Sequence, residues 1–282
     1  MSVAAEALPV RPGRSALDRA WAFVRRHTLT VYALLAFAYL LVPIAVVILF
    51  SFNSPAGRFN FTWQGFTLDN WRNWDGVPGL REAITLSVEI ALLSSIAATV
   101  LGTLIALALV RYGFRGRGTT NLLIFLPMST PEIVLGASLL TLFLNLNVQF
   151  GFWTIVIAHV MFCISYVVVT VKARLIGFDR HLEEAAMDLG ANELETFRLV
   201  TLPLIAPAIL SAALLSFALS IDDFVITYFN AGPKITFPIF VWGAARVGAP
   251  PQVNVIGTAI FLFAVTAMVA NVLVQTRRAR NA

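Results

Sequence analysis

Long apolar runs separated by short polar connections dominate the chain. A helix needs about 20 apolar residues to cross the hydrocarbon core of a bilayer. The stretches that meet this length predict six membrane spans, at 30–51, 83–110, 119–145, 151–172, 204–230 and 253–276. No connection is long enough to bury a core of its own. We therefore expect an all-α membrane domain over 30–276, with short tails at 1–29 and 277–282.

Composition supports this interpretation. The chain is 59% hydrophobic and 12% charged, so its polar residues are too few to cover a soluble globule. A net charge of +5 suggests a nucleic-acid partner only in a soluble protein, and we expect none here. The single cysteine, Cys163, lies in an apolar run, which excludes an internal disulfide and predicts a buried structural thiol.

Basic residues are divided unevenly between the two sides of the predicted membrane domain. An even number of spans places both termini on one side. That side carries Arg11, Arg14, Arg19, Arg25, Arg26, Arg111, Arg115, Arg117, Lys172, Arg174, Arg180, Arg198, Arg277, Arg278 and Arg280. The opposite side carries Arg58, Arg72, Arg81, Lys234 and Arg246. The positive-inside rule therefore predicts cytoplasmic termini and a cytoplasmic connection at 173–203.

This connection contains a small acidic, alanine-rich island, EEAAMDLGAN. Helical spacing predicts one side formed by Leu182, Ala185, Ala186 and Leu189, and a more exposed side formed by Glu183, Glu184 and Asp188. Gly190 is a typical helix stop. Asn192 followed by Glu195 predicts the start of a second short helix that runs to Pro203.

The spacing of the island resembles the EAA motif of permease subunits of binding-protein-dependent ABC importers. That motif reads E-A-A, three residues, G, nine residues, I, one residue, L-P. Here its positions are Glu184, Ala185, Ala186, Gly190, Val200, Leu202 and Pro203, with Val200 as the only departure. The resemblance implies a type I importer permease fold of the bacterial inner membrane. It also implies that the island is a coupling helix seated in a groove of a cytoplasmic ATPase.

The chain itself lacks the signature of an ATPase. Lys172 and Lys234 are its only lysines, and neither belongs to a G-x-x-x-x-G-K-[ST] phosphate loop. We therefore expect a non-catalytic subunit without a cofactor or metal, with ATP and Mg on a separate ATPase.

Acidic residues interrupt the apolar spans, and such residues usually face protein or a water-filled path. Glu132 follows Pro131 in LPMSTPEIVLG. Pro127 and Pro131 are expected to break the third span, with Thr130 capping a half-helix whose first turn holds Glu132. A role in the pathway or gate is the alternative for Glu132. Glu89 is expected to pair with Arg81 or a partner subunit, or to face the path.

Asp222 and Asp223 lie near the outer end of the fifth predicted span, where substrate arrives. Two ionised carboxylates about 5 Å apart repel each other by about 3 kcal/mol at an effective dielectric of 20, and a polycation would relieve this. The alternative is a hydrogen-bonded brace, and one acid can brace while the other lines the path. Tyr228 and Trp242 are candidates for cation–π contacts or for interfacial anchors.

SIDDFVIT followed by GP, a Pro-Ile element and VNVIGTAI resembles the spermidine/putrescine branch of these permeases. The resemblance implies a heterodimer with a second, homologous permease, a homodimeric ATPase and an extracytoplasmic binding protein. Another small cationic or amino-compound nutrient, or ferric ion, is the alternative substrate. A secondary transporter or channel is the rival from another class. An embedded enzyme is disfavoured because His27, His159 and His181 lack metal-ligand spacing.

Overall fold

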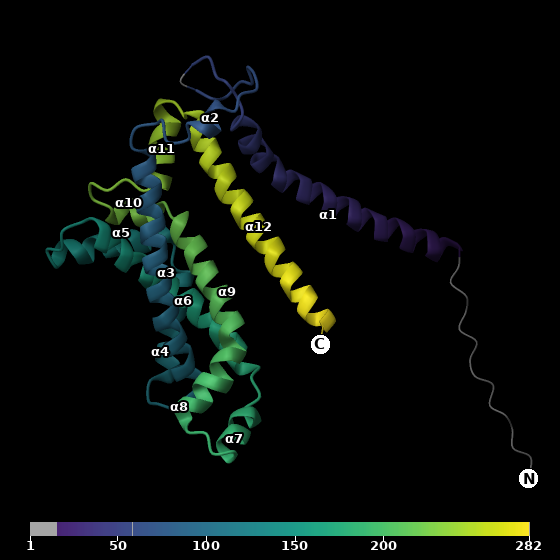
Figure 1. The fold of residues 1–282 in the computed structure, drawn as a ribbon, viewed down its shortest axis with the longest axis vertical. Helices are drawn as coiled ribbons and strands as arrows, with labels where there is room; N and C mark the ends of the chain where they lie inside the picture. Colours follow the sequence, from purple (N-terminus) through teal and green to yellow (C-terminus); the bar gives the residue numbers. More distant parts are fainter. Residues whose placement is uncertain (1–15, 58, 282) are drawn as a thin grey trace, which may run out of the picture. The chain divides into compact units, whose positions relative to one another are not determined.

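The computed structural model describes residues 16–57 and 59–281 (Figure 1). The regular elements in this part of the chain are helices. The chain divides into two compact units, one from Asp75 to Ala249 and one that joins the residues up to Trp74 with those from Pro250 onward. Of the predicted tail at 1–29, residues 1–15 lie outside the described residues, and residues 16–29 form the first part of a helix that continues to Phe50.

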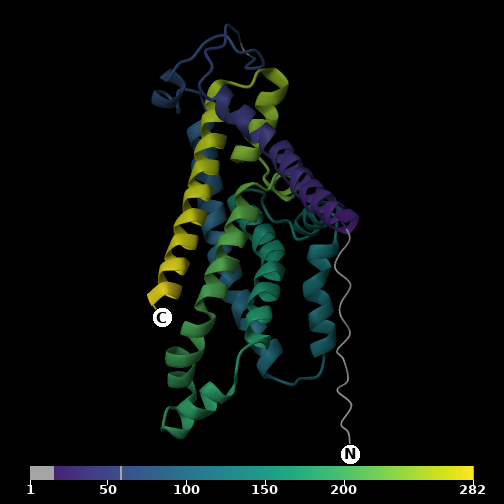
Figure 2. The same ribbon diagram turned by 90° about the vertical axis from the view of Figure 1, so that its right-hand side faces the viewer.

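The unit Asp75–Ala249 is built around three long helices that pack side by side (Figures 1 and 2). They are α3 (Leu80–Arg111), α6 (Phe152–Ile176) and α9 (Leu202–Ile221). Small residues recur on the buried face of α3, including Ala91, Ala98, Gly102 and Ala106. Small residues allow helix backbones to approach closely in a membrane, where apolar burial alone does not drive association. Cys163 of α6 is fully buried in the same core, as the sequence predicted.

Gly102 marks a close approach between α3 and α6. A Cβ atom at this position would lie 2.7 Å from Val167 Cβ. We expect Gly102→Ala to destabilise the protein by about 1–3 kcal/mol through overpacking. Thermal unfolding of the purified protein in detergent measures this, with Gly118→Ala as the control, because nothing lies within 4 Å of a Cβ built at Gly118. Equal melting temperatures for the two variants would contradict this packing.

The third predicted span, 119–145, is broken into two helices, as the prolines in the sequence predicted. The helices α4 (Arg117–Ser129) and α5 (Glu132–Asn145) meet at an angle of 109°. The break falls at Pro131 as predicted, whereas Pro127 lies inside α4. Thr130 precedes a proline and is extended, with ψ 133°, as steric contact with the proline ring requires. Its hydroxyl donates to the Leu126 carbonyl, so it does not cap α5.

The fifth predicted span is also interrupted. The helix α9 ends at Ile221, and the short helix α10 (Val225–Asn230) begins after a three-residue break that contains Asp222 and Asp223. The sequence predicted one helix over 204–230. The break places both acids at helix ends, where backbone groups lack partners within the helix.

Within the described residues, four helices are long and apolar enough to cross a bilayer, and the bent α4–α5 pair makes a fifth if it is counted as one span. These four segments are His27–Phe50, Leu80–Arg111, Phe152–Ile176 and Glu193–Ile221. The sixth predicted span, 253–276, lies in α12 (Pro251–Asn281). As far as the described residues show, the apolar stretch of α12 is Pro251–Thr266, which is shorter than a span. The six predicted spans are therefore confirmed only in part.

The second unit contains α1 (Ala16–Phe50), α2 (Asp69–Arg72) and α12, with α1 packed on α12. Buried Asn53 organises the loop between α1 and α2. Its amide donates to Asn60 Oδ1 at 2.6 Å and to the Thr62 carbonyl at 2.8 Å, and its Oδ1 accepts from the Gln64 N–H at 2.8 Å. Aromatic side chains of this loop, such as Phe61, are exposed.

Candidate functional site

The connection 173–203, which the sequence predicts to be cytoplasmic, forms two short helices at one end of the α3–α6–α9 bundle (Figures 1 and 2). The first is α7 (His181–Asp188) and the second is α8 (Glu193–Thr196). Asn192 Oδ1 accepts from the Glu195 N–H at 2.9 Å, and Glu195 Oε2 accepts from the Asn192 N–H at 2.9 Å. This capping box confirms the predicted start of the second helix.

Gly190 ends α7 as the sequence predicted. Its φ of +96° lies in the left-handed region that favours glycine. The Gly190 N–H donates to the Met187 carbonyl at 2.9 Å, and the Ala191 N–H donates to the Ala186 carbonyl at 3.1 Å. This bonding is the Schellman motif, which satisfies the last carbonyls of the helix and fixes the turn toward α8.

The second helix does not end at Pro203, which corrects the prediction. It continues from α8 through a π-helical turn, η1 (Phe197–Thr201), directly into α9. The Leu202 N–H bonds to the Phe197 carbonyl, five residues back. Pro203 has no N–H to continue the ordinary helical ladder, and the wider turn directly before it accommodates this loss. Leu202 and Pro203 are exposed at the start of α9.

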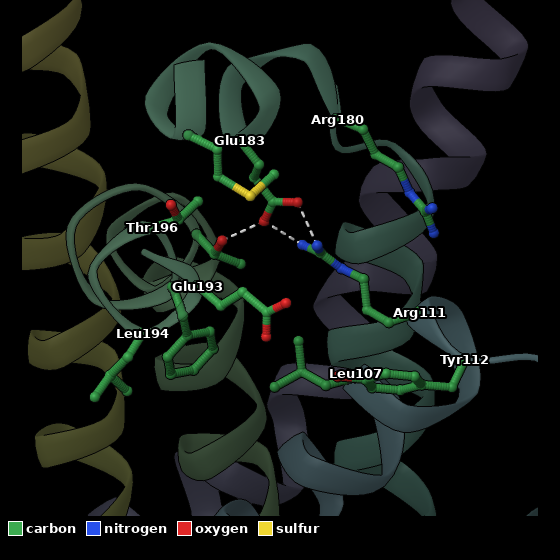
Figure 3. A pocket seen from close by; sticks show the side chains of 11 residues that line it. Leu107, Arg111, Tyr112, Arg180, Glu183, Glu193, Leu194 and Thr196 are labelled. Carbon is green, nitrogen blue, oxygen red and sulfur yellow. Dashed lines mark hydrogen bonds and ion pairs between the residues drawn. The ribbon is translucent and has the colours of Figure 1, made fainter. Parts of the chain in front are cut away.

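The faces of α7 differ from the prediction. Glu183 is buried, with 6% exposure, whereas Leu182 and Leu189 are 48% and 91% exposed. The cause is an ion pair, because both terminal nitrogens of Arg111 donate to the Glu183 carboxylate and the Thr201 hydroxyl donates to it as well (Figure 3). The side of α7 that carries Leu182 is therefore exposed, and Leu189 directly after the helix is exposed as well.

The motif residues of α7 are accessible to a partner. Glu184 and Ala185 are exposed and Ala186 is partly exposed. Together with the exposed Leu182 and Leu189, they form a mixed acidic and apolar surface. Small side chains there permit the close approach that seating in a groove requires.

A pocket of about 590 Å³ lies beside the ion pair, between α3, α7 and α8 (Figure 3). Arg180 extends along its edge and donates to the Val110 carbonyl at 3.1 Å. Burial alone would raise the pKa of Glu183. The hydrogen bonds from Arg111 and Thr201, with the charges of Arg111 and Arg180, outweigh burial and hold this pKa below its ordinary value.

A depressed pKa makes the contribution of Glu183 to stability dependent on pH. The contribution is complete above the ordinary carboxyl pKa of 4.5 and is lost as the pH falls through the lower folded-state pKa. We expect the melting temperatures of wild type and Glu183→Gln to differ by a constant amount above about pH 6 and to converge in acid. Thermal unfolding of both proteins at several pH values from about 3 to about 8 measures this difference in melting temperature. A difference that grows in acid would contradict the assignment.

The second group of candidate residues lies at the break between α9 and α10. Asp223 is 8% exposed and accepts from the Thr227 N–H at 2.7 Å and the Thr227 hydroxyl at 2.8 Å. Its Oδ2 lies 3.3 Å from His159 Nε2, while His159 Nδ1 lies 2.6 Å from the Ser220 hydroxyl. Asp223 is therefore hydrogen-bonded as in the alternative interpretation of the acid pair, and His159 is buried and hydrogen-bonded between Ser220 and Thr227.

Asp222 has a different environment. It follows the last residue of α9 and is exposed. The charges of Asp223 and Glu132 both act on it. Glu132 is exposed in the first turn of α5, as predicted. The break thus gathers acids from two separate segments of the chain, with Asp222 more open than Asp223.

Aromatic residues adjoin this break. Phe224 lies 5.4 Å from Tyr228 and 5.2 Å from Trp242 of α11 (Phe237–Val247) between ring centroids. Tyr228 and Trp242 are 58% and 46% exposed. The guanidinium of Arg246 already lies over the Trp242 ring at 4.5 Å. Both aromatic alternatives from the sequence remain predictions.

Glu89 does not pair with Arg81 in the described chain. Arg81 lies 4.0 Å from Asp75 instead, and Glu89 is exposed. Sequence reasoning also missed Arg111, Thr201 and Phe224. Arg111 lies 72 residues from Glu183, so no local spacing links the two. Phe224 directly follows the acid pair, and its position was the only available signal.

Comparison with known proteins identifies the family. Residues 98–280 match the family described as "Binding-protein-dependent transport system inner membrane component". The chain belongs to this family. It is 40% identical over 246 residues to the spermidine/putrescine transport system permease protein PotC of Escherichia coli strain K12, covering 87% of this chain and 92% of that protein. It is also 40% identical to the putrescine transport system permease protein PotI of the same strain, covering 84% of this chain and 86% of that protein.

Solved structures show the same fold. A bacterial ABC transporter involved in the import of the acidic polysaccharide alginate matches with a TM-score of 0.62 and 19% identity, covering 94% of this chain and 99% of that chain. An amino acid ABC transporter matches with a TM-score of 0.54 and 16% identity, covering 76% of this chain and 99% of that chain. The chain therefore has the fold of a type I ABC importer permease and is a multi-pass membrane component of a transport system.

Proposed function

We propose that the chain is a permease subunit of an ATP-driven polyamine importer in the bacterial inner membrane. In this proposal six spans cross the bilayer, with both termini and the segment 173–203 in the cytoplasm. The observation that carries the proposal is the pairing of an exposed EAA-type segment with acids gathered at a helix break. The polyamine names of relatives that are 40% identical support the substrate class.

The coupling segment docks on the ATPase. Glu184 pairs with basic groups of the partner, Ala185 and Ala186 permit close approach, and Gly190 fixes the angle between α7 and α8. Leu202 and Pro203 begin the helix that continues into the membrane. The exposed surface of α7 supports this role because nothing in the described chain covers Leu189.

The other partners complete the transporter. A second, homologous permease forms a heterodimer with this chain, the ATPase is a homodimer that holds ATP and Mg, and an extracytoplasmic protein delivers substrate. ATP-driven closure of the ATPase displaces the coupling segments, and the permeases alternate between inward-open and outward-open states. This chain contributes transmission and substrate contacts without covalent catalysis.

Asp222 and Glu132 meet the ammonium groups of the polyamine, whereas Asp223 positions the break. A polycation at this point relieves the repulsion that the gathered acids exert on Asp222. Tyr228 and Trp242 contribute aromatic faces beside the acids.

Stimulation of ATP hydrolysis by the loaded binding protein tests the substrate class. The complete complex, in lipid, is given its binding protein with spermidine, putrescine, arginine or ferric ion, and the ligand-free binding protein is the control. We expect stimulation by spermidine or putrescine and none by arginine or ferric ion. Stimulation by arginine or ferric ion alone would replace the polyamine assignment by one of the alternative substrates.

A further inference from the structure

One helix touches both candidate sites. The helix α3 runs for 32 residues without a proline, and its cytoplasmic end carries Arg111, which holds Glu183 of α7. Seventeen residues earlier, at about 26 Å along the axis, the Ser94 hydroxyl lies 2.9 Å from the Ser220 hydroxyl of α9. About two turns closer to the start of α3, Ser87 accepts from the Phe237 N–H of α11 at 2.8 Å.

The contact at Ser94 continues to the acids at the helix break. Ser220 is bonded to His159 Nδ1 at 2.6 Å. His159 Nε2 lies 2.8 Å from the Thr227 hydroxyl and 3.3 Å from Asp223 Oδ2. These side chains are all buried, so each would leave an unpaired polar group if the contact opened. The break is thereby fixed to α3 through an uninterrupted series of hydrogen bonds.

The contact at the other end of α3 is equally specific. Glu183 receives hydrogen bonds from two nitrogens of one guanidinium and from Thr201 of η1. A bidentate arginine fixes orientation as well as distance, which a single charge contact does not. Glu183 is buried within its own chain, so it is not available to the ATPase, whereas its neighbour Glu184 is exposed.

We propose that the Arg111–Glu183 pair is the mechanical link by which displacement of the coupling segment moves α3 and, through Ser94 and Ser220, the acid-bearing break. Arg111 and Glu183 are positioning residues in this scheme, because neither contacts substrate or nucleotide. The proposal rests on the proposed function of ATP-driven import. A stiff helix with a specific buried contact at each end connects the two sites through a continuous series of interactions, which is a stronger physical basis for coupling than proximity alone.

The pair is tested by neutralising each member and both together. Arg111→Gln, Glu183→Gln and the double variant are reconstituted as complete complexes in proteoliposomes, and labelled polyamine uptake is measured per ATP hydrolysed. Arg117→Gln is the matched control, since it removes a positive charge from the same cytoplasmic connection and leaves the pair intact. Co-purification of the ATPase measures assembly in every variant.

We expect each single variant to lower uptake per ATP by about tenfold, within the range that side chains along a coupling route produce. The double variant is expected to lose no more than the worse single variant, because the two residues act as one contact. Arg117→Gln is expected to retain the wild-type ratio.

Three results would overturn the link. They are single variants within about twofold of wild type, losses that multiply to about a hundredfold in the double variant, or losses explained by failed assembly alone. Wild type that hydrolyses ATP without importing polyamine would refute the proposed substrate instead. In that case the link is tested by measuring how much the loaded binding protein stimulates ATP hydrolysis. The link requires that the single variants lose this stimulation.

Discussion

Gly190→Val is expected to lower polyamine uptake per ATP hydrolysed by about tenfold or more while the membrane domain stays folded. Gly190 has a φ of +96°, and a β-branched residue in that region costs about 1–3 kcal/mol. Nothing lies within 4 Å of a Cβ built there, so the effect comes from the backbone and not from a clash. Relaxing the strain changes the angle between α7 and α8, which disturbs docking and transmission.

Gly190→Asn is the matched control for this prediction. Asparagine adopts the left-handed region more readily than valine, so we expect a clearly smaller loss. Reconstituted complexes are compared in the same uptake and hydrolysis assays, with melting temperature as the measure of folding. Equal losses for Asn and Val would show that side-chain bulk, and not backbone conformation, matters at this position.

Asp222→Asn and Asp223→Asn are expected to fail in different ways. Asp222 is exposed at the break, so its neutralisation is expected to reduce uptake by about tenfold, because one charge contact with an ammonium group is worth about 1.5–3 kcal/mol. Assembly and melting temperature are expected to stay near wild type.

Asp223→Asn is expected to act mainly by lowering the stability of the folded protein. Both oxygens of Asp223 accept backbone N–H groups, from Ile226 at 3.4 Å and Thr227 at 2.7 Å. An amide offers only one acceptor oxygen, so one buried donor loses its partner at a cost of about 1–3 kcal/mol. Thermal unfolding and the yield of assembled complex measure this. The reverse pattern, with Asp222→Asn unstable and Asp223→Asn stable but inactive, would contradict the assigned roles.

Local signals in the sequence predicted the local structure correctly. The capping box of Asn192 and Glu195, the helix stop at Gly190 and the break at Pro131 each depend on residues a few positions apart, and the structure confirms all three. The angle between α4 and α5 was not predictable from the sequence, because it depends on the packing of α5 against α10, which is distant along the chain.

Contacts made by the folded chain explain the two wrong predictions about α7 and the fifth span. Helical spacing placed Glu183 on the exposed side of α7, but Arg111 from a distant segment holds it inside. Apolarity alone extended the fifth span through Asp222, whereas Asp223 finds bonding partners in His159 and Thr227 when the helix breaks. Pairings of this kind have no fixed spacing along the chain, and each one contradicts the pattern expected from periodicity.

Accumulation of labelled spermidine and putrescine in proteoliposomes tests the central claim most directly. The vesicle membranes contain the complete complex. ATP is supplied on the side of the membrane where segment 173–203 lies, and the binding protein is supplied on the opposite side. We expect accumulation that requires both ATP and the binding protein and that a proton gradient alone does not drive. Accumulation driven by a proton gradient without ATP would contradict the account and favour a secondary transporter.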